Sequence, residues 1–414
     1  MRIIVMNHNY PPETASTGRL THDIASRLVR EGHVVTVVTG QPGYDTPLPS
    51  RPDVEFVDGV TVARVWNPWV PKRKLVRRGL RYLIYCVLEF VQAFRWPADL
   101  IIVMSQPPIL NGLVGRLMAR LRHLPYIYVA WDLNPDQAEA TGVLPRGLLT
   151  AWLLAVDTKT MRTATRIVVP GDDIAHRIRD TRVVQERRIL AIVPWLPSDV
   201  RPGGLESGPI GDVPASQFLV LYSGNVGLYY DLERVIGAAE LLRDDSRIRI
   251  AIVGDGAMKG RLQSMTRRRE LRNVSFNDYV PADKLMPLLR QADVHLVPLA
   301  DSMLGISSPS KLAPIMAAGR AILAMVPDES DVARIVRAAD CGIVLAHASP
   351  DAIATAIIQM ASNPKLVEKW GENATKYYTR WLERDRALRT FATLVRELDV
   401  STVRADALPD AKDA

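Results

Sequence analysis

The chain has 414 residues, which is too long for one compact core of ordinary size and favours two domains. Hydrophobic residues make up 48% and charged residues 23%, so the chain is neither a disordered polyelectrolyte nor a bundle of membrane spans. Its two cysteines, Cys86 and Cys341, lie far apart and exclude a disulfide framework or a cysteine-based zinc site. The net charge of +7 permits nucleic acid, an acidic membrane surface or a phosphorylated substrate as the partner.

The chain opens with MRIIVMNHNYPPE, in which the apolar run is only five residues long. Such a run is too short for the apolar region of a secretory signal, so we expect a cytoplasmic protein. Motifs of metalloproteases, serine hydrolases and P-loop enzymes are absent from the sequence, and its seven histidines are scattered. We therefore expect no metal site and no resident cofactor.

Short β-branched apolar runs alternate with stretches of helical length along the whole chain. In the first half these runs cover residues 2–6, 34–38, 100–104, 126–130 and 166–169. After a passage rich in Pro and Gly, residues 194–214, the runs resume at 218–222, 249–253, 294–297 and 321–325. The alternation predicts an α/β fold with two Rossmann-like, parallel-sheet domains facing a cleft, because loops and helix N-termini gather at the carboxyl ends of parallel strands.

The same pattern gives the domain boundaries. We expect an N-terminal domain over residues 1–200, a second domain over residues 201–378 and a flexible tail over residues 401–414. Residues 364–398 carry aromatic and aliphatic side chains at helical spacing, which predicts two helices ahead of the tail.

Two glycine turns stand between a strand and a helix, one in each half of the chain. Gly18 and Arg19 follow the first strand, and Gly224 and Asn225 follow the strand at 218–222. In this order, backbone N–H groups at the start of the helix can meet a phosphate. Each turn alone is equally compatible with an ordinary strand-to-helix turn, whereas two facing turns favour a phosphate site.

A third candidate for anion binding is the segment that opens a helix predicted over residues 312–318. Ser308 and Ser310 bring hydroxyl groups to the N-terminus of this helix, and Lys311 lies in its first turn. The alternative is a capped surface helix with a solvated lysine. We favour the phosphate site because the segment follows a strand at the edge of the predicted cleft.

Asp132 follows the strand at 126–130 in the string WDLNPD. A carboxylate at this strand end points into the cleft, where it can take a proton or anchor a hydroxyl group. The alternative is a side chain that caps the following turn, which the neighbouring Asn134 and Pro135 make equally plausible.

Residues 71–96 read PKRKLVRRGLRYLIYCVLEFVQAFRW. Five of the basic residues at its start are candidates for membrane contact: Lys72, Arg73, Lys74, Arg77 and Arg78. The apolar, aromatic-rich part that follows is too short and too interrupted to span a bilayer, and it suits a helix lying on an anionic membrane. The alternative is a crossover helix buried against the sheet with a solvated basic start. Basic residues spread along a groove with stacking aromatics are not visible, so no nucleic-acid partner is expected.

Five strings follow one another in a specific order: YPPETASTGRLTHDIASRLVREGHVVTVVTG, YSGNVGLYYDLERVIGAAELL, VGDG, ADVHLVPL and PSKLAPIMAAGR. Together they resemble the GT-B family of retaining, nucleotide-sugar-dependent glycosyltransferases (family four), especially the branch that builds bacterial exopolysaccharide and O-antigen. The likeness covers residues 1 to about 398. It implies an acceptor site in the N-terminal domain, a donor site in the C-terminal domain and a last helix, residues 379–398, that crosses back to the first domain.

The resemblance also implies roles for single residues. The donor-binding set is Gly18 and Arg19 from the first domain, and Gly224, Asn225, Tyr279, Val280, Ser308, Ser310 and Lys311 from the second, with Tyr279 and Val280 at the nucleobase pocket. The basic pair usual after the first strand of the C-terminal domain is replaced by Asn225 and Tyr230, which leaves Lys311 as the best candidate to meet the diphosphate charge and Arg19 as the second.

Two further departures concern acidic and catalytic positions. The two glutamates of the family fall on Ile306 and Pro314, so recognition of the ribose by a carboxylate is not expected. The histidine of the catalytic region falls at or near Asp132, which makes Asp132 the catalytic candidate.

These observations favour an enzyme that transfers a sugar, with retention, from a nucleotide diphosphate sugar to a hydroxyl group of a membrane-linked or polysaccharide-precursor acceptor. We expect the enzyme in the cytoplasm, bound peripherally at the inner face of the plasma membrane. The missing glutamate pair leaves open a catalytically silent scaffold of the same fold that binds a nucleotide or a partner enzyme. A phosphorylase of this fold would need a cofactor-bearing lysine that the sequence does not advertise.

Overall fold

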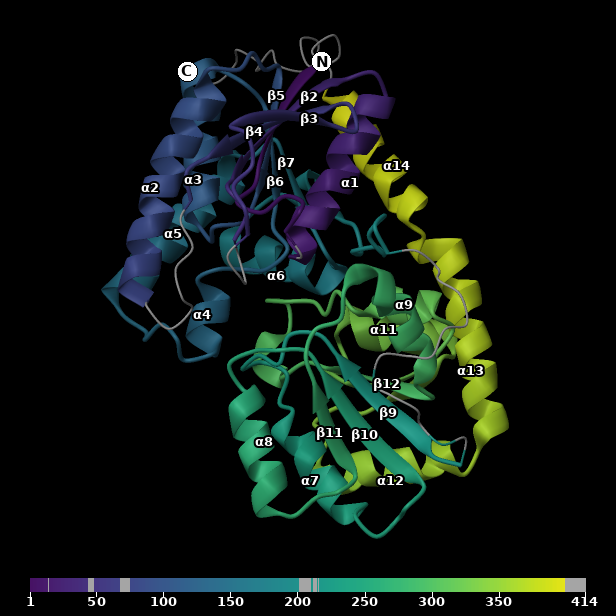
Figure 1. The fold of residues 1–414 in the computed structure, drawn as a ribbon. Helices are drawn as coiled ribbons and strands as arrows, with labels where there is room; N and C mark the ends of the chain where they lie inside the picture. Colours follow the sequence, from purple (N-terminus) through teal and green to yellow (C-terminus); the bar gives the residue numbers. More distant parts are fainter. Residues whose placement is uncertain are drawn as a thin grey trace.

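The computed structural model describes residues 1–13, 15–43, 48–67, 75–200, 210, 214 and 216–398, without the side chains of residues 75, 76 and 78. Two α/β units are stacked in Figure 1, each built on its own sheet. The strand order is β3-β4-β2-β1-β5-β6-β7-β8 in the first sheet and β11-β10-β9-β12-β13-β14 in the second. The two parallel-sheet units expected from the sequence are thus confirmed, and the predicted tail at 401–414 lies outside the described residues.

The strands of the first sheet are β1 (Arg2–Met6), β2 (Val34–Gly40), β3 (Val54–Val57), β4 (Val60–Val65), β5 (Leu100–Met104), β6 (Tyr126–Val129), β7 (Arg166–Val169) and β8 (Ile189–Ala191). Those of the second are β9 (Phe218–Ser223), β10 (Ile248–Val253), β11 (Val274–Asn277), β12 (Val294–Pro298), β13 (Ala321–Met325) and β14 (Gly342–Val344). The central strands β1 and β5 are continuous aliphatic runs because helices cover both faces of the sheet. All the strands predicted from such runs are present.

One edge of the first sheet is not parallel. Strands β3 and β4 form an antiparallel hairpin whose turn residues Asp58 and Gly59 have φ angles of 52° and 82°. Positive φ at both central residues is the geometry of a tight hairpin turn, which Asp-Gly favours. This hairpin was not predicted, although the Asp-Gly pair between the short apolar segments VEFV and VTVARV is a local signal for it.

The helices of the first unit are α1 (Ser16–Arg30), α2 (Leu75–Phe94), α3 (Leu110–Arg122), α4 (Asp136–Ala140), α5 (Leu148–Thr163) and α6 (Asp172–Arg182). Those that follow are α7 (Glu233–Leu241), α8 (Lys259–Arg268), α9 (Ala282–Gln291), α10 (Leu312–Ala317), α11 (Asp331–Ala339), α12 (Pro350–Ala361), α13 (Pro364–Tyr377) and α14 (Arg384–Glu397). Short helical turns lie at Glu186–Arg188, Asp301–Met303 and Tyr378–Leu382. Helices α2, α3 and α5 cover one face of the first sheet, and α1 and α14 cover the other.

The last two helices connect the two units. Helix α13 packs on α10 and β13 of the second unit, whereas α14 packs on α1 of the first. Figure 1 shows this pair running along one side of the molecule. Leu388, Phe391 and Val395 of α14 lie in the same apolar cluster as Ile24 and Leu28 of α1. Apolar burial therefore holds the C-terminal segment against the N-terminal unit.

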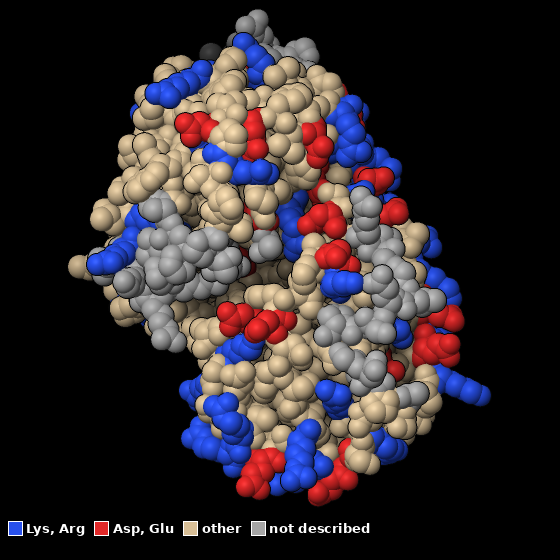
Figure 2. Space-filling view, viewed as in Figure 1, with Lys and Arg blue, Asp and Glu red and all other residues tan. Residues whose placement is uncertain are grey.

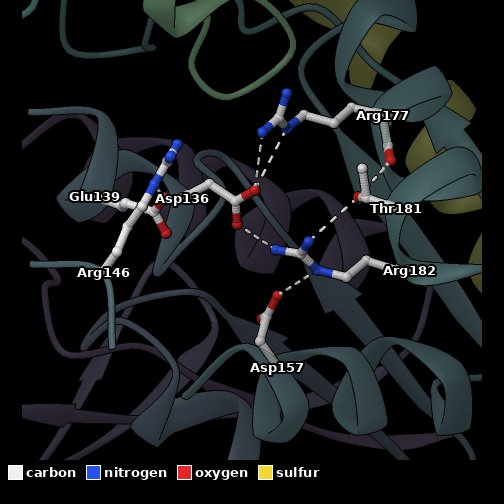
Figure 3. Close-up of polar contacts among 7 residues, drawn as sticks. All are labelled: Asp136, Glu139, Arg146, Asp157, Arg177, Thr181 and Arg182. Carbon is white, nitrogen blue, oxygen red and sulfur yellow. Dashed lines mark hydrogen bonds and ion pairs between the residues drawn. The ribbon is translucent and has the colours of Figure 1, made fainter. Parts of the chain in front are cut away.

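A buried ionic cluster anchors the segment between β6 and α5 (Figure 3). The guanidinium of Arg182 forms an ion pair with Asp136, the first residue of α4, and lies 3.2 Å from Asp157 on α5. Arg177 reaches the same Asp136 carboxylate at 3.2 Å. Arg182 is 1% exposed and Asp157 is 2% exposed, and burial raises the pKa of Asp157 to about 7. The loop that begins at Asp132 is thus held at its far end by Arg182.

Replacement Arg182→Leu tests this anchor. The change leaves Asp157 buried without its cation, and we expect the free energy of unfolding to fall by about 3–5 kcal/mol. The loss should be larger at alkaline than at mildly acidic pH, because acid neutralises the stranded Asp157 carboxyl.

Urea unfolding at both pH values measures this effect. Arg146→Leu is the matched control, since its side chain is 89% exposed beside Glu139 and its pair should contribute about 0–1 kcal/mol. Equal losses in the two variants would contradict the anchoring role.

Candidate active site

Two glycine loops meet at the carboxyl ends of β9 and β10. Gly224 has a φ angle of 136° and Gly254 one of 139°, values that disfavour any residue with a Cβ atom. A Cβ atom on Gly254 would lie only 1.9 Å from the carbonyl oxygen of Gly224, so the two loops are in direct backbone contact. The predicted turn at Gly224 is therefore present, and the backbone of the loop at Gly254 packs against it.

Lys311 lies directly beside the Gly224 turn. Its Nζ is 3.7 Å from the ring centroid of Tyr222 and 4.6 Å from that of Tyr230. A Cβ atom on Gly224 would lie 3.4 Å from the same Nζ. The glycine turn, the two aromatic rings and the ammonium group thus form one compact cluster.

The ammonium group of Lys311 is buried without an anion. Within the described part of the chain, its Nζ has no hydrogen-bond partner. Burial lowers the pKa of Lys311 well below its ordinary value of 10.5. A solvated surface lysine, the alternative left open by the sequence, is excluded by this geometry. Two electron-rich rings stabilise a cation here but do not replace a counter-ion, so the cluster can accept a negatively charged ligand.

Asp132 joins the two units at the opposite side of this cluster. The Oγ of Ser307 donates a hydrogen bond of 2.5 Å to its carboxylate, and the N–H of Leu133 donates one of 2.9 Å to the carbonyl oxygen of Ile306. Burial raises the pKa of Asp132, although the Ser307 hydroxyl acts in the opposite direction. The carboxylate is therefore bonded across the domain contact rather than to the turn that follows it.

Tyr230 is near both the lysine and the aspartate, since its ring is 4.6 Å from the Lys311 Nζ and the charge of Asp132 acts on its hydroxyl. Burial raises the pKa of its hydroxyl first, and the charges of neighbouring Tyr residues and of Asp132 raise it further. The structure therefore places Lys311, Tyr230 and Asp132 in one electrostatic neighbourhood. Ser307, Tyr222 and Tyr230 were not among the predicted site residues, because only the folded chain brings them to Lys311 and Asp132.

The candidates of the first domain lie in the first turn of α1. We expected Gly18 to form a turn before the helix. That prediction was wrong, because α1 begins at Ser16 and Gly18 is helical. A Cβ atom on Gly18 would lie 3.1 Å from the backbone of Asn9 and Tyr10. Glycine is thus required for the close approach of this helix end to the segment after β1. The Nη1 of Arg19 lies 3.5 Å from the Oδ2 of Asp199. Arg19 therefore has a carboxylate as its counter-ion, unlike Lys311 among the described residues.

The remaining donor candidates surround the glycine loops. Asn225 is exposed, and its Nδ2 lies 3.5 Å from the hydroxyl of Tyr229. Tyr279 is 53% exposed and donates a 3.3 Å hydrogen bond to the carbonyl oxygen of Asp255, which ties it to the loop beside Gly254. Val280 is half-buried next to it.

The two predicted serines differ in exposure, since Ser308 is half-buried and Ser310 is exposed. The side chain that reaches Asp132 is that of Ser307. Figure 2 shows the molecule hollowed where the two units meet, the side on which the strand ends of both sheets gather.

The structure describes only part of the predicted membrane segment, residues 71–96. Lys72, Arg73 and Lys74 lie outside the described residues, as does the side chain of Arg78, whereas Arg77 is exposed on α2. Tyr85, Glu89 and Ala93 of this helix are fully buried against the rest of the unit. One face of α2 is therefore buried, as expected for a crossover helix. Among the helices described, none is long and apolar enough to cross a bilayer.

Comparison with known proteins supports this architecture. Residues 17–195 match the model of a glycosyl transferase 4-like domain, and residues 209–377 match that of glycosyl transferases group 1. The colanic acid biosynthesis glycosyl transferase WcaI, so named in Escherichia coli (strain K12), is 26% identical over 421 residues, which cover 96% of this chain and all of the relative.

Solved structures share the fold. Sucrose-phosphate synthase from Thermosynechococcus elongatus has a TM-score of 0.73 at 16% identity, with 96% of this chain and 99% of that chain covered. HepE from Anabaena, solved in complex with UDP, has a TM-score of 0.66 at 13% identity, with 96% and 100% covered. The fold, the order of the two matched domains and the full-length relative agree. The chain belongs to the family-four glycosyltransferases of the GT-B fold.

Proposed function

We propose that this glycosyltransferase moves a sugar from a nucleotide diphosphate sugar to a hydroxyl group of a membrane-linked or polysaccharide-precursor acceptor, with retention of configuration and without a metal or other cofactor. The observation that carries the proposal is the buried ammonium of Lys311, which has no anion among the described residues and lies beside the backbone of Gly224. A diphosphate supplies the missing charge, and a preorganised cation stabilises the charge that develops on a leaving diphosphate.

The donor would lie across the two glycine loops. Gly224 and Asn225 flank the phosphates on one side, Ser308 and Ser310 lie on the other, and Gly18 and Arg19 approach from α1. Tyr279 and Val280 line the place of the nucleobase. HepE, which shares the fold, was solved with UDP bound, and this makes UDP the first nucleotide to test.

Asp132 is the group proposed to serve the acceptor. The acceptor oxygen forms a bond to the anomeric carbon, the bond from that carbon to the phosphate oxygen breaks, and its electron pair stays on the nucleotide diphosphate. The proton of the acceptor hydroxyl passes to the carboxylate of Asp132, whose pKa is raised by burial. The Ser307 hydroxyl donates a hydrogen bond to one of the two carboxylate oxygens.

The class of acceptor rests on the relatives. WcaI is named for the biosynthesis of colanic acid. Retention of the anomeric configuration is proposed from the family resemblance. NMR of the product, which measures its anomeric configuration, tests this proposal.

Lys311→Met removes the cation and keeps most of the side-chain volume. We expect the affinity for UDP to fall by about 1.5–3 kcal/mol, the range for a hydrogen bond to a charged group. Adding Tyr230→Lys should restore part of the affinity, since this position carries a basic residue in the common family pattern and its ring is 4.6 Å from Nζ. Titration calorimetry with UDP, GDP and ADP measures both effects, and unchanged affinity in Lys311→Met would remove Lys311 from the donor site.

The same replacement should stabilise the free protein. The unfolded chain binds the lysine proton more tightly than the folded chain does, because burial lowers the folded pKa. Near neutral pH the free energy of unfolding of Lys311→Met should therefore exceed that of the parent by about 1–3 kcal/mol. The difference should shrink as the pH rises toward 10.5, where the unfolded lysine also loses its proton. Chemical denaturation across this range tests the sign, and a destabilised variant would contradict it.

Asp132→Asn keeps the shape of the side chain and removes its basicity. Turnover should fall by roughly two to four orders of magnitude while UDP affinity changes little. Asp180→Asn, at an exposed position of α6, is the control and should retain parental rates. Parental turnover in Asp132→Asn would reduce Asp132 to a contact between the two units.

Purified protein incubated with nucleotide sugars and lipid-linked or saccharide acceptors tests the reaction itself. Product formation supports the proposal. Nucleotide binding without any turnover or donor hydrolysis would favour the silent scaffold, for which the replacement of the family's glutamates by Ile306 and Pro314 is the argument.

A further inference from the structure

Two helices from different units contact each other through their first turns, α6 of the first unit and α11 of the second. The backbone N–H of Asp173 on α6 donates a 3.2 Å hydrogen bond to Oδ2 of Asp331 on α11. In the opposite direction, the N–H of Asp331 donates one of 3.5 Å to Oδ2 of Asp173. Each helix end therefore bonds the aspartate of the other, although the two residues are 158 positions apart in the chain.

The carboxyl groups of this pair lie close together in a buried place. Asp331 is 5% exposed. A Cβ atom on Gly171, the residue before α6, would lie 2.1 Å from Oδ2 of Asp331 and 3.0 Å from Oδ1 of Asp173. The absence of a side chain on Gly171 thus leaves the space in which both carboxyl groups lie.

This arrangement favours a proton on the pair. Burial is the main cause that raises the pKa of Asp173 to about 6, and the charge of Asp331 and a hydrogen bond to its carboxyl group act in the same direction. The backbone N–H groups of Ile174 and Asp331 act in the opposite direction. Two carboxylates in contact repel each other, and a proton shared between them removes the repulsion.

One cation is bonded to the pair, and it reaches only Asp331. The Nε of Arg334 on α11 lies 3.0 Å from Oδ1 of Asp331, and the same exposed guanidinium pairs with Asp172 at 3.2 Å. Tyr377 of α13 acts on the pKa of Arg334 as well. Among the described residues, no cation bonds the carboxyl group of Asp173.

The other charged groups nearby bond elsewhere. The strands packed on the two helices, β7, β8, β13 and β14, contain one charged residue, Arg166, which bonds the carbonyl oxygen of Thr165 at the start of β7. On the neighbouring helices and loops, Asp157 and Arg162 bond Arg182 at the far end of α6, Arg177 bonds Asp136, Asp301 bonds His347 and Asp328 bonds Arg337.

The same end of α6 also contacts the loop that brings Ser307 to Asp132. A Cβ atom on Gly305 would lie 3.0 Å from the carbonyl oxygen of Asp173 and 3.2 Å from Cβ of Arg177. Ser307 follows two residues later and donates its hydrogen bond to Asp132. Movement of α6 away from the second unit would therefore loosen the segment that joins the two units at Asp132.

We propose that Asp173 and Asp331 form a pH-sensitive latch between the two units, which holds while the pair shares a proton and loosens when both carboxylates are charged. The pKa of Asp173 is about 6 in the contact, against an ordinary value of 3.8. The stabilisation is therefore fully present below pH 3.8 and is lost as the pH rises through about 6. From about pH 5 to about pH 7, the equilibrium should shift roughly tenfold toward the separated helices. The latch does not depend on the proposed transferase function.

Hydrogen exchange at the backbone N–H groups of residues 173 and 331 tests the latch in the full chain. The first N–H groups of a helix have no partner within the helix, so protection of these two reports the contact between the units. After correction for the intrinsic effect of pH on exchange, their protection in the parent should fall roughly tenfold from about pH 5 to about pH 7. The N–H groups of the central strand β5 should be protected far more strongly at both pH values, because they exchange only when the unit unfolds.

Asp173→Asn removes the titrating group and keeps a side-chain oxygen for the N–H of Ile174. The protection of residues 173 and 331 in this variant should be the same at both pH values. Asp331→Asn should reduce the dependence on pH without abolishing it, because burial of Asp173 remains. The matched control is Asp172→Asn, which removes a charge of the same sign from the adjacent, exposed position and should keep the parental dependence.

Two results would overturn the inference. One is equal protection of residues 173 and 331 at both pH values in the parent. The other is a parental dependence on pH that persists in Asp173→Asn while β5 stays protected, because another group would then control the contact.

Discussion

The structure of the donor side depends on a lysine side chain that the protein buries without a counter-charge among the described residues, so that burial lowers the pKa of its amino group. Lys311 is held by Tyr222, Tyr230 and the turn at Gly224, and within the described residues no carboxylate bonds its Nζ. Removing an ammonium from water costs several kcal/mol unless a counter-charge is present. Burial therefore favours the uncharged amine in the free protein, and a bound anion favours the charged form again.

Several contacts hold the groups around Lys311 and Asp132 in fixed positions. Backbone contact between the loops at Gly224 and Gly254 fixes the ends of β9 and β10, while the bond from Ser307 to Asp132 fixes the position of one unit against the other. The Arg182 cluster holds the far end of the Asp132 loop, and α14 returns the C-terminus to the first unit. Each of these contacts reduces the freedom of a group that must stand near the donor or the acceptor, and such preorganisation is what electrostatic catalysis requires.

The central strands and the place of Lys311 could be predicted, because aliphatic runs and a helix start after a strand are local signals. The hairpin at Asp58 and Gly59 was not predicted, although its Asp-Gly turn between two short apolar segments is also a local signal. Gly18 was placed in a turn although it lies within α1, where its lack of a Cβ atom serves packing against Asn9. Ser307 and Arg182 could not be found from sequence, because their partners lie far along the chain: Ser307 meets Asp132 175 residues away, and Arg182 meets Asp157 25 residues away.

Proton uptake on nucleotide binding tests the central claim most directly. Titration calorimetry with UDP, repeated at a pH of about 8 in buffers of different ionisation enthalpy, counts the protons that accompany binding. At this pH the nucleotide is fully ionised, since phosphate groups lose their second proton near pH 6. We predict that the parent takes up a proton as the diphosphate restores the charge of Lys311, and that Lys311→Met takes up none. Binding without proton uptake by the parent, or the same uptake in Lys311→Met, would contradict it.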